Sequence, residues 1–217
     1  MNISIAIDGP AGAGKSTISK LLADKINFNY LDTGAMYRAY TYYYLSNGID
    51  VENEEEINNN IKNINLSIED SKFFLNGKDV SKEIRSQEVT KNVSLVSSYI
   101  KVRENLVKSQ QSIASKSNII LDGRDIGSNV LKDADMKFFL TASPEVRAKR
   151  RMDQNNDNTM TYEETLADIN RRDHFDSNRK ISPLVIADDA IIIDSSDLNI
   201  EEVVDAMISY LEKNHVI

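Results

Sequence analysis

Residues 9–16 constrain the fold of this chain more than any other segment. They read Gly-Pro-Ala-Gly-Ala-Gly-Lys-Ser and match the phosphate-loop pattern, with four positions between the first glycine and the Gly-Lys pair. An apolar run at residues 3–7 precedes the loop and a helical pattern follows it, which is the context that the motif requires. Small residues let backbone N–H groups surround phosphate oxygens, and the helix N-terminus adds positive potential. The segment predicts a nucleotide-phosphate site, with Lys15 on the β- and γ-phosphates and the Ser16 hydroxyl on Mg²⁺.

Short apolar runs that suit buried strands alternate with helical patterns along the chain. The predicted strands are residues 3–7, 28–31, 119–121, 136–140 and 191–193. Helix starts are marked in the C-terminal half by Ser143 before Pro144, by Thr161 with Glu164 three residues later, and by Asn199 before an amphipathic segment. Alternation of this kind is typical of an α/β fold with a parallel sheet.

One stretch interrupts the alternation. Residues 50–64 are rich in Glu and Asn and predict an exposed helix or loop. Residues 66–80 carry short β patterns, with Asn76 and Gly77 as the turn of a hairpin, and residues 81–116 return to helix. An antiparallel unit inside a parallel architecture indicates an insertion.

Composition and charge exclude several classes of protein. The 217 residues include 26 Lys plus Arg and 34 Asp plus Glu, a net charge of −8, so we expect no nucleic-acid partner and no attraction to an anionic membrane. The chain has no Cys and only two His, His174 and His215, which excludes disulfides, thiol catalysis and a His-built metal site. It also has no apolar run of roughly 20 residues and no basic N-terminal signal, so we expect a cytoplasmic location.

Further motifs separate the classes of phosphate-loop protein. A GTPase would carry Asp-x-x-Gly and Asn-Lys-x-Asp, and the sequence has neither. An ATPase motor would end an apolar strand in acidic residues. Asp122, after residues 119–121, fits that position loosely as an outer partner of Mg²⁺, or it is a turn residue at the strand end.

Two polar loops directly follow predicted strands, so they lie at the same edge of the sheet as the phosphate loop. Ligands of open α/β sheets bind at this edge, the carboxyl ends of the strands. Residues 32–38 carry Thr33 at a helix start and Arg38, whose guanidinium suits phosphate oxygens. Residues 122–127 carry Arg124, suited to a phosphate, and Asp125, suited to an amino group of a base. The alternatives are a helix cap with a surface arginine, and a solvated ion pair.

Arginines concentrate late in the chain, with seven of ten after residue 120. Two groups have helical spacing and flank the polar residues 153–159. The groups are Arg147, Arg150 and Arg151, and Arg172, Asp176 and Arg179. Phosphoryl transfer needs guanidinium groups and exclusion of water, so the pattern predicts a hinged lid. Solvated helix faces are the alternative.

Together these motifs resemble those of bacterial cytidylate kinases, a family of nucleoside-monophosphate kinases, over nearly the whole chain. The matching segments are residues 9–17, 31–38, 83–85, 102–104, 121–127, 147–151, 172–179, 182–184 and 187–190. The resemblance implies a single kinase domain, residues 1–217, with a five-stranded parallel sheet and helices on both faces. It also implies a monophosphate-binding segment near 33–105, a small antiparallel insertion near 62–85 and a helical lid near 147–180.

The resemblance further implies roles for individual residues. For the acceptor, Arg38 and Arg124 would bind the phosphate, Ser94, Arg103 and Asp125 would read the cytosine edge, Arg172 and Asp176 would hold the ribose, and Thr33 would line the same site. The donor would bind Gly9, Pro10, Ala11, Gly12, Ala13, Gly14, Lys15, Ser16 and Thr17. Lys15, Arg151 and Arg179 would be catalytic.

The sequence therefore predicts a kinase that uses ATP and Mg²⁺ to convert CMP or dCMP to the diphosphate. We expect a monomer, because no long exposed apolar helix suggests an obligate dimer. One alternative is another small-molecule kinase of the same fold, acting on a sugar or a hydroxy acid. The other is a non-catalytic nucleotide-binding switch. The preference among CMP, dCMP and UMP and the range of donor nucleotides are left open.

Overall fold

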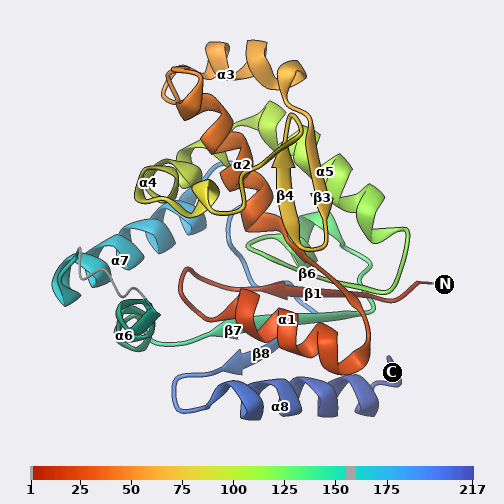
Figure 1. The fold of residues 1–217 in the computed structure, drawn as a ribbon. Helices are drawn as coiled ribbons and strands as arrows, with labels where there is room; N and C mark the ends of the chain where they lie inside the picture. The colour runs from red at the N-terminus through yellow and green to blue at the C-terminus, as the bar shows by residue number, and fades with distance from the viewer. Residues whose placement is uncertain (1, 155–159) are drawn as a thin grey trace. The chain divides into compact units, whose positions relative to one another are not determined.

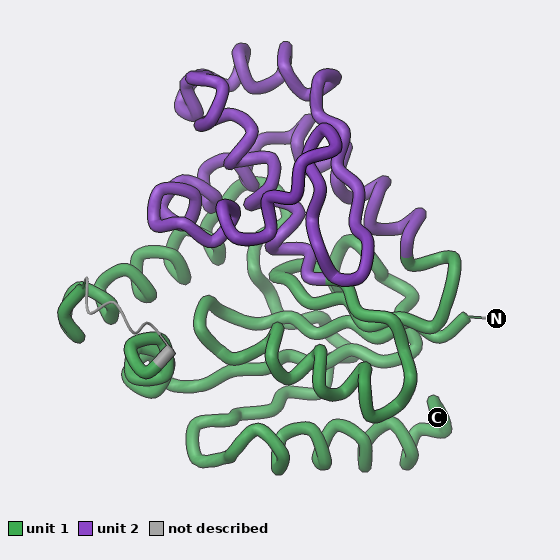
Figure 2. Tube along the Cα trace, in the orientation of Figure 1, with its two compact units in different colours: residues 1–31, 114–217 green, residues 32–113 purple. Residues whose placement is uncertain are grey.

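A computed structural model describes residues 2–154 and 160–217 (Figure 1). The chain folds as two compact units, one formed by Met1–Leu31 with Ala114–Ile217 and the other by Asp32–Ile113 (Figure 2). We call them unit 1 and unit 2. Residues 155–159 of the predicted lid, most of its polar stretch, lie outside the described residues.

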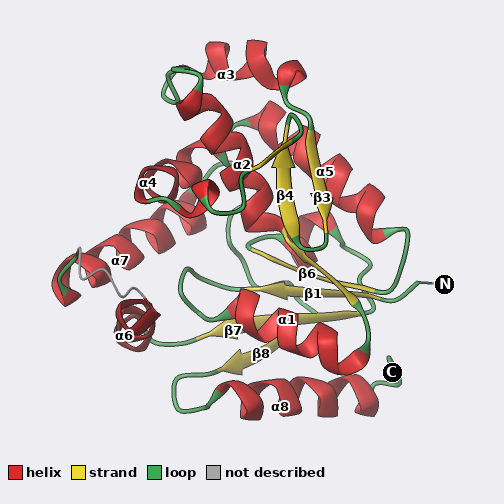
Figure 3. Ribbon diagram, viewed as in Figure 1, coloured by secondary structure: helices red, strands yellow, loops and turns green. Residues whose placement is uncertain are grey.

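The central sheet has five strands in the order β2-β6-β1-β7-β8 (Figure 3). They are β1 (Ser4–Asp8), β2 (Asn29–Asp32), β6 (Ile119–Gly123), β7 (Met136–Thr141) and β8 (Ile191–Asp194). β1 pairs in parallel with both β6 and β7, and Ile5 stands opposite Ile120 and Met136. All five predicted strands and the predicted parallel sheet are confirmed. The phosphate loop leaves the central strand, β1.

Two helices cover one face of this sheet, α1 (Lys15–Ile26) and α8 (Ile200–Lys213). The core between them and the strands includes Ile5, Ile7, Ile18, Leu22, Ile120, Phe138, Leu140, Val203, Val204 and Met207. Ala6 and Leu121, which alternate with these strand residues, are also fully buried. Burial on both faces explains why the strands read as nearly continuous apolar runs.

Helix starts in unit 1 follow the predicted caps. The Ser143 hydroxyl accepts a hydrogen bond from the N–H of Val146 at the start of α6 (Pro144–Gln154). Complete capping boxes begin α7 (Tyr162–Asn178) at Thr161 and α8 at Asn199. Among the described residues, no helix has both the length and the apolar character needed to cross a bilayer.

Unit 2 contains helices and a small antiparallel sheet of order β3-β4-β5. The strands are β3 (Leu66–Glu69), β4 (Lys72–Leu75) and β5 (Lys78–Asp79). The helices are α2 (Thr33–Ser46), α3 (Glu54–Asn60), α4 (Gln87–Val96) and α5 (Ile100–Ala114). Two short 3-10 turns are η1 (Ile61–Asn63) and η2 (Glu83–Arg85). Asn76 and Gly77 both have positive φ, 50° and 82°, as a tight hairpin turn requires, so the predicted hairpin is confirmed.

Candidate functional site

The backbone of the phosphate loop depends on glycine at two positions. A Cβ atom at Gly9 would lie 1.9 Å from the carbonyl oxygen of Leu140 on β7, so only glycine allows the two strands to pass so closely. Gly14 caps α1 with a φ of 87°, and the first helical bond runs from the N–H of Ile18 to its carbonyl. The N–H groups of the first helical turn, residues 15–17, therefore have no carbonyl partner within the helix. A loop of this shape is suited to binding an anion.

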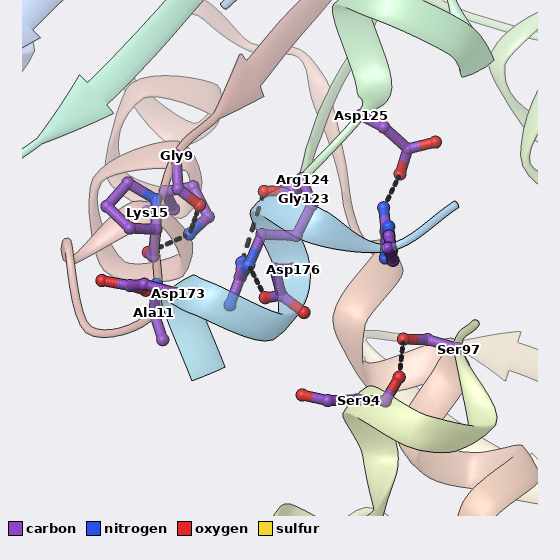
Figure 4. A network of polar contacts seen from close by, with 12 residues as sticks. Gly9, Ala11, Lys15, Ser94, Ser97, Gly123, Arg124, Asp125, Asp173 and Asp176 are labelled. Carbon is purple, nitrogen blue, oxygen red and sulfur yellow. Dashed lines mark hydrogen bonds and ion pairs between the residues drawn. The ribbon is translucent and has the colours of Figure 1, made fainter. Parts of the chain in front are cut away.

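Lys15 is buried beneath this loop. Its ammonium donates to the carbonyl oxygens of Gly9 and Pro10, both at 2.8 Å (Figure 4). Burial lowers the pKa of Lys15 to about 7, and the nearby Arg124 guanidinium acts in the same direction against the attraction of carboxylates such as Asp122. A phosphate group at this position would supply the counter-charge that favours the ammonium form.

Ser16 and Asp122 lie side by side at the ends of α1 and β6. The Ser16 hydroxyl donates to Asp122 Oδ2 at 3.0 Å, and the Tyr30 hydroxyl donates to the other carboxylate oxygen at 2.9 Å. Among residues 2–154 and 160–217, no group of three or more His, Cys, Asp or Glu side chains could hold a metal ion. A hydroxyl beside one carboxylate does fit Mg²⁺, which keeps several waters and takes its other ligands from phosphates.

Asp8, the last residue of β1, fixes the loop that follows β6. Its carboxylate accepts the N–H groups of Ile126 and Gly127, both at 2.8 Å, in the short π-type turn η3 (Ile126–Val130). Burial raises the pKa of Asp8 to about 6, although these two hydrogen bonds act to lower it. The sequence prediction missed Asp8. An acidic residue that ends a buried strand directly before the phosphate loop was the available signal.

The inward face of α7 is unusually polar. Its buried residues are Thr165, Ile169, Arg172 and Asp176, which follow the helical repeat along one side. Three of these four side chains can donate or accept hydrogen bonds, whereas an ordinary packed helix would present apolar residues there. Buried charges require partners, so this face indicates a site rather than a hydrophobic contact.

Two ion pairs join the C-terminal part of α7 to the loop after β6 (Figure 4). Arg124 Nε donates to Asp176 Oδ2 at 3.0 Å, and Arg179 Nη2 donates to Asp125 Oδ1 at 3.2 Å. The second pair is almost completely buried, with side-chain exposures of 4% for Arg179 and 6% for Asp125. The structure thus brings together four of the residues predicted to bind the acceptor or the transferring phosphoryl group.

The three arginines of α6, whose spacing places them about one turn apart, each contact a different partner. Arg147 is buried, and Arg150 donates to the hydroxyl of Ser195 at 2.9 Å. Arg151 donates to Asp168 on α7 at 3.0 Å. Helical spacing places the three close together, but long-range packing gives each a different partner.

Unit 2 carries its own polar cluster. Thr33 is buried at the start of α2, which Asp32 caps by accepting the N–H of Ala35 at 2.8 Å. One turn later, Arg38 donates to the hydroxyl of Thr90 on α4 at 2.8 Å.

A second arginine of unit 2 is more deeply held. Arg103 on α5 is 3% exposed, and it donates to the carbonyl oxygen of Ser97 at 3.2 Å. Its guanidinium carbon lies 5.6 Å from the ring centroid of Tyr37, a cation–π contact. The Ser97 hydroxyl donates in turn to the carbonyl oxygen of Ser94 at 2.9 Å (Figure 4). Buried polar groups of this kind suit the recognition of a planar polar ligand.

Comparison with known proteins identifies the family. The sequence model of the cytidylate kinase family matches residues 5–213. The chain belongs to the cytidylate kinase family. It is 50% identical over 210 residues to a cytidylate kinase of Clostridioides difficile, covering 96% of this chain and 97% of that protein. It is also 50% identical over 216 residues to a cytidylate kinase of Caldanaerobacter subterraneus, covering 99% and 96%.

Solved structures agree on the fold of this cytidylate kinase family member. A shikimate kinase from Bacteroides thetaiotaomicron aligns with a TM-score of 0.51 at 14% identity, covering 97% of this chain and 98% of that one. A deoxyadenosine kinase from M. mycoides aligns with a TM-score of 0.50 at 16% identity, covering 97% and 100%. At such low identity these structures support the kinase fold alone.

Within each unit of this cytidylate kinase family member, the predicted residues fall into clusters. Unit 1 holds the phosphate loop, the Ser16 hydroxyl and the ion pairs of α7, while unit 2 holds Thr33, Arg38, Ser94 and Arg103. The sequence did not predict three polar partners of these residues, namely Thr90 for Arg38, Ser97 for Arg103 and Tyr30 for Asp122. Their residue types are common on ordinary helices and strands, and no local pattern marked them.

Proposed function

We propose that this member of the cytidylate kinase family transfers the γ-phosphoryl group of ATP to CMP or dCMP, giving the diphosphate. An oxygen of the acceptor α-phosphate attacks the γ-phosphorus, the bond to the β–γ bridging oxygen breaks, and ADP leaves. The observation that carries the proposal is the presence, within unit 1, of a phosphate loop together with two Arg–Asp ion pairs, one of them almost completely buried. The near full-length identity of 50% to cytidylate kinases supports CMP as acceptor.

For the donor, we propose that the loop of residues 9–17 binds the triphosphate of ATP, that backbone N–H groups of this loop contact the phosphates, and that Lys15 lies on the β- and γ-phosphates. Ser16 and Asp122 would hold Mg²⁺, Ser16 directly and Asp122 through water. The ion, when bound, neutralises charge that develops on the phosphate oxygens.

For the acceptor, we propose that Arg124 exchanges its Asp176 partner for the phosphate of CMP, and that Arg172 and Asp176 bind the ribose. Asp125, which also accepts from the Asn129 amide at 3.0 Å, offers a carboxylate to the cytosine amino group. In unit 2, Thr33 and Arg38 would contact the phosphate, while Ser94 and Arg103 would contact the base.

For catalysis, we propose that Lys15, Arg151 and Arg179 stabilise the charge of the transferring phosphoryl group. Arg151 and Arg179 are paired with Asp168 and Asp125, so the charge of each guanidinium is compensated. The predicted lid at residues 147–180 would exclude water from the transfer.

The test is a coupled assay that measures ADP formation with ATP and each of CMP, dCMP, UMP and AMP. We expect kcat/KM to be highest for CMP or dCMP. Faster turnover of UMP, AMP, a sugar or a hydroxy acid would refute the assignment.

Lys15→Ala should lose most of kcat, whereas Lys20→Ala, which changes an exposed lysine on the same helix, should leave kcat unchanged. Full activity in Lys15→Ala would favour a binding switch.

We also propose that the protein works as a monomer, which light scattering coupled to size-exclusion chromatography can measure. A cytoplasmic location remains a prediction from the sequence.

A further inference from the structure

The backbone of Ala11, within the phosphate loop, is held at both its N–H and its carbonyl oxygen by one ion pair. Its N–H donates to Asp173 Oδ1 at 3.2 Å, and its carbonyl oxygen accepts from Arg147 Nη1 at 2.9 Å. The same Arg147 nitrogen donates to Asp173 Oδ2 at 2.6 Å. These three hydrogen bonds form a closed ring of Ala11, Asp173 and Arg147, and Figure 4 shows Asp173 beside Ala11.

The arginine of this ring is firmly anchored. Its side chain is 4% exposed, against 22% for Asp173, and its Nε also donates to the carbonyl oxygen of Ala142 at 2.9 Å. A Cβ atom at Gly12 would lie 3.3 Å from Arg147 Cβ, so α6 is packed directly against the loop. Because the guanidinium and the carboxylate compensate each other, the pair adds little net charge to the phosphate site. Its contribution to the site is geometric.

We propose that Asp173 is a positioning residue that fixes the phosphate loop for the donor nucleotide. Its carboxylate orients the Ala11 peptide and thereby the following loop residues, whose N–H groups meet the phosphates. The N–H of Ala11 itself is directed at Asp173, which assigns Ala11 to loop positioning and not to phosphate binding. The inference rests on the proposed function only in requiring that the loop binds ATP.

The same helix links this anchor to the acceptor cluster. Asp176, one turn beyond Asp173 on α7, is the partner of Arg124. One rigid helix therefore contacts both the phosphate loop and the loop after β6, and Asp173 is its contact on the donor side.

Asp173→Asn separates positioning from electrostatics because the two effects have opposite signs. The substitution leaves Arg147 without a compensating charge beside the loop, and this extra positive charge alone would tighten the binding of a triphosphate. The amide of Asn has a single accepting oxygen, whereas Asp173 uses one oxygen for Ala11 and the other for Arg147, so one of these hydrogen bonds is lost and the ring opens. A misplaced loop weakens binding, by about 10- to 100-fold if it behaves like the supporting residues of metal ligands.

The experiment measures the Kd of a non-hydrolysable ATP analogue by calorimetry without acceptor, and the two KM values in the coupled assay. For Asp173→Asn we expect about 10-fold weaker binding of the analogue and a similar rise in KM for ATP, with KM for CMP within 2-fold of wild type. Unchanged or tighter binding of the analogue would overturn the proposal. An equal rise in both KM values would also overturn it, because it would indicate a general loss of structure.

Two further variants complete the design. Asp205→Asn removes an ion pair of unit 1 on the surface, between Lys25 and Asp205 at 2.8 Å, and should change neither constant. Asp173→Glu keeps the charge and shifts the carboxylate by one methylene, and it should weaken analogue binding at least 3-fold. If Asp173→Asn fails to fold, Asp173→Glu decides alone, and wild-type affinity refutes the proposal. Failure of CMP turnover would refute the acceptor assignment and leave the analogue result standing.

Discussion

Breaking the buried ion pair between Arg179 and Asp125 should cost far more stability than breaking a surface pair. The two side chains are 4% and 6% exposed, with the guanidinium nitrogen 3.2 Å from the carboxylate oxygen. Asp125→Asn removes the carboxylate charge that is paired with the buried guanidinium, and breaking a buried ion pair on one side typically costs about 3–5 kcal/mol. For a chain of this size each kcal/mol lowers Tm by about 2–4 °C, so we expect a drop of roughly 6–20 °C.

Urea unfolding followed by circular dichroism measures the loss in the free energy of unfolding, and a thermal scan measures the drop in Tm. Asp205→Asn is the matched control. The Lys25–Asp205 pair has the same chemistry and a distance of 2.8 Å, but its side chains are 39% and 67% exposed. Solvent screens such a pair, so the control should lose at most about 1 kcal/mol. Equal losses in the two variants would refute the reasoning that burial makes the Arg179–Asp125 pair sensitive.

A double variant separates the cost of an unpaired charge from the worth of the pair itself. Asp125→Asn with Arg179→Met removes both charges, and buried pairs replaced together are often nearly neutral in stability. We therefore expect the double variant to regain most of the loss caused by Asp125→Asn. A double variant as unstable as the sum of the two single variants would show that the charges do not interact.

Two further predictions concern the phosphate loop. Gly9→Ala should lower the free energy of unfolding in urea by at least about 3 kcal/mol, because the new methyl group would lie 1.9 Å from the Leu140 carbonyl oxygen. Wild-type stability of this variant would contradict the close approach of the two strands. Burial sets the pKa of Lys15 to about 7, so at pH 8 the free amine is mostly neutral, and a bound triphosphate raises this pKa. ATP-analogue binding at pH 8 should therefore take up close to one proton, measured by calorimetry in buffers of different ionisation enthalpy; binding without proton uptake would refute this.

The hairpin turn and the helix caps were predicted correctly because each depends on only a few neighbouring residues. The hairpin turn at Asn76 and Gly77 requires positive φ at both positions, and these are among the residues that adopt it most readily. The capping boxes at Thr161 and Asn199 need only two side chains three residues apart. Patterns that span only two to four residues can be interpreted without knowledge of the rest of the fold.

Partners distant in the chain could not be predicted in this way. Arg147 meets Asp173, 26 residues later, and Arg150 meets Ser195, 45 residues later. Both contacts exist because α6 packs on α7 and near the end of β8, an arrangement that no local spacing encodes. The helical spacing of the three arginines therefore did not predict their partners. For Asp8, the position at the end of a buried strand was a local signal, but its partners Ile126 and Gly127 lie 118 and 119 residues later and no local pattern indicated them.

The polar inward face of α7 connects the fold to the proposed reaction. A helix that packed with apolar side chains would be more stable, but it would offer no groups for an anionic ligand. Here Arg124 already binds a carboxylate oxygen of Asp176 at 3.0 Å, in the position that a phosphate oxygen can take. In the proposed reaction, the phosphate would exchange one anion for another at this guanidinium, which would never be left uncompensated. The site would give up some affinity in this exchange, and in return its charged residues would be folded and oriented before the ligand binds.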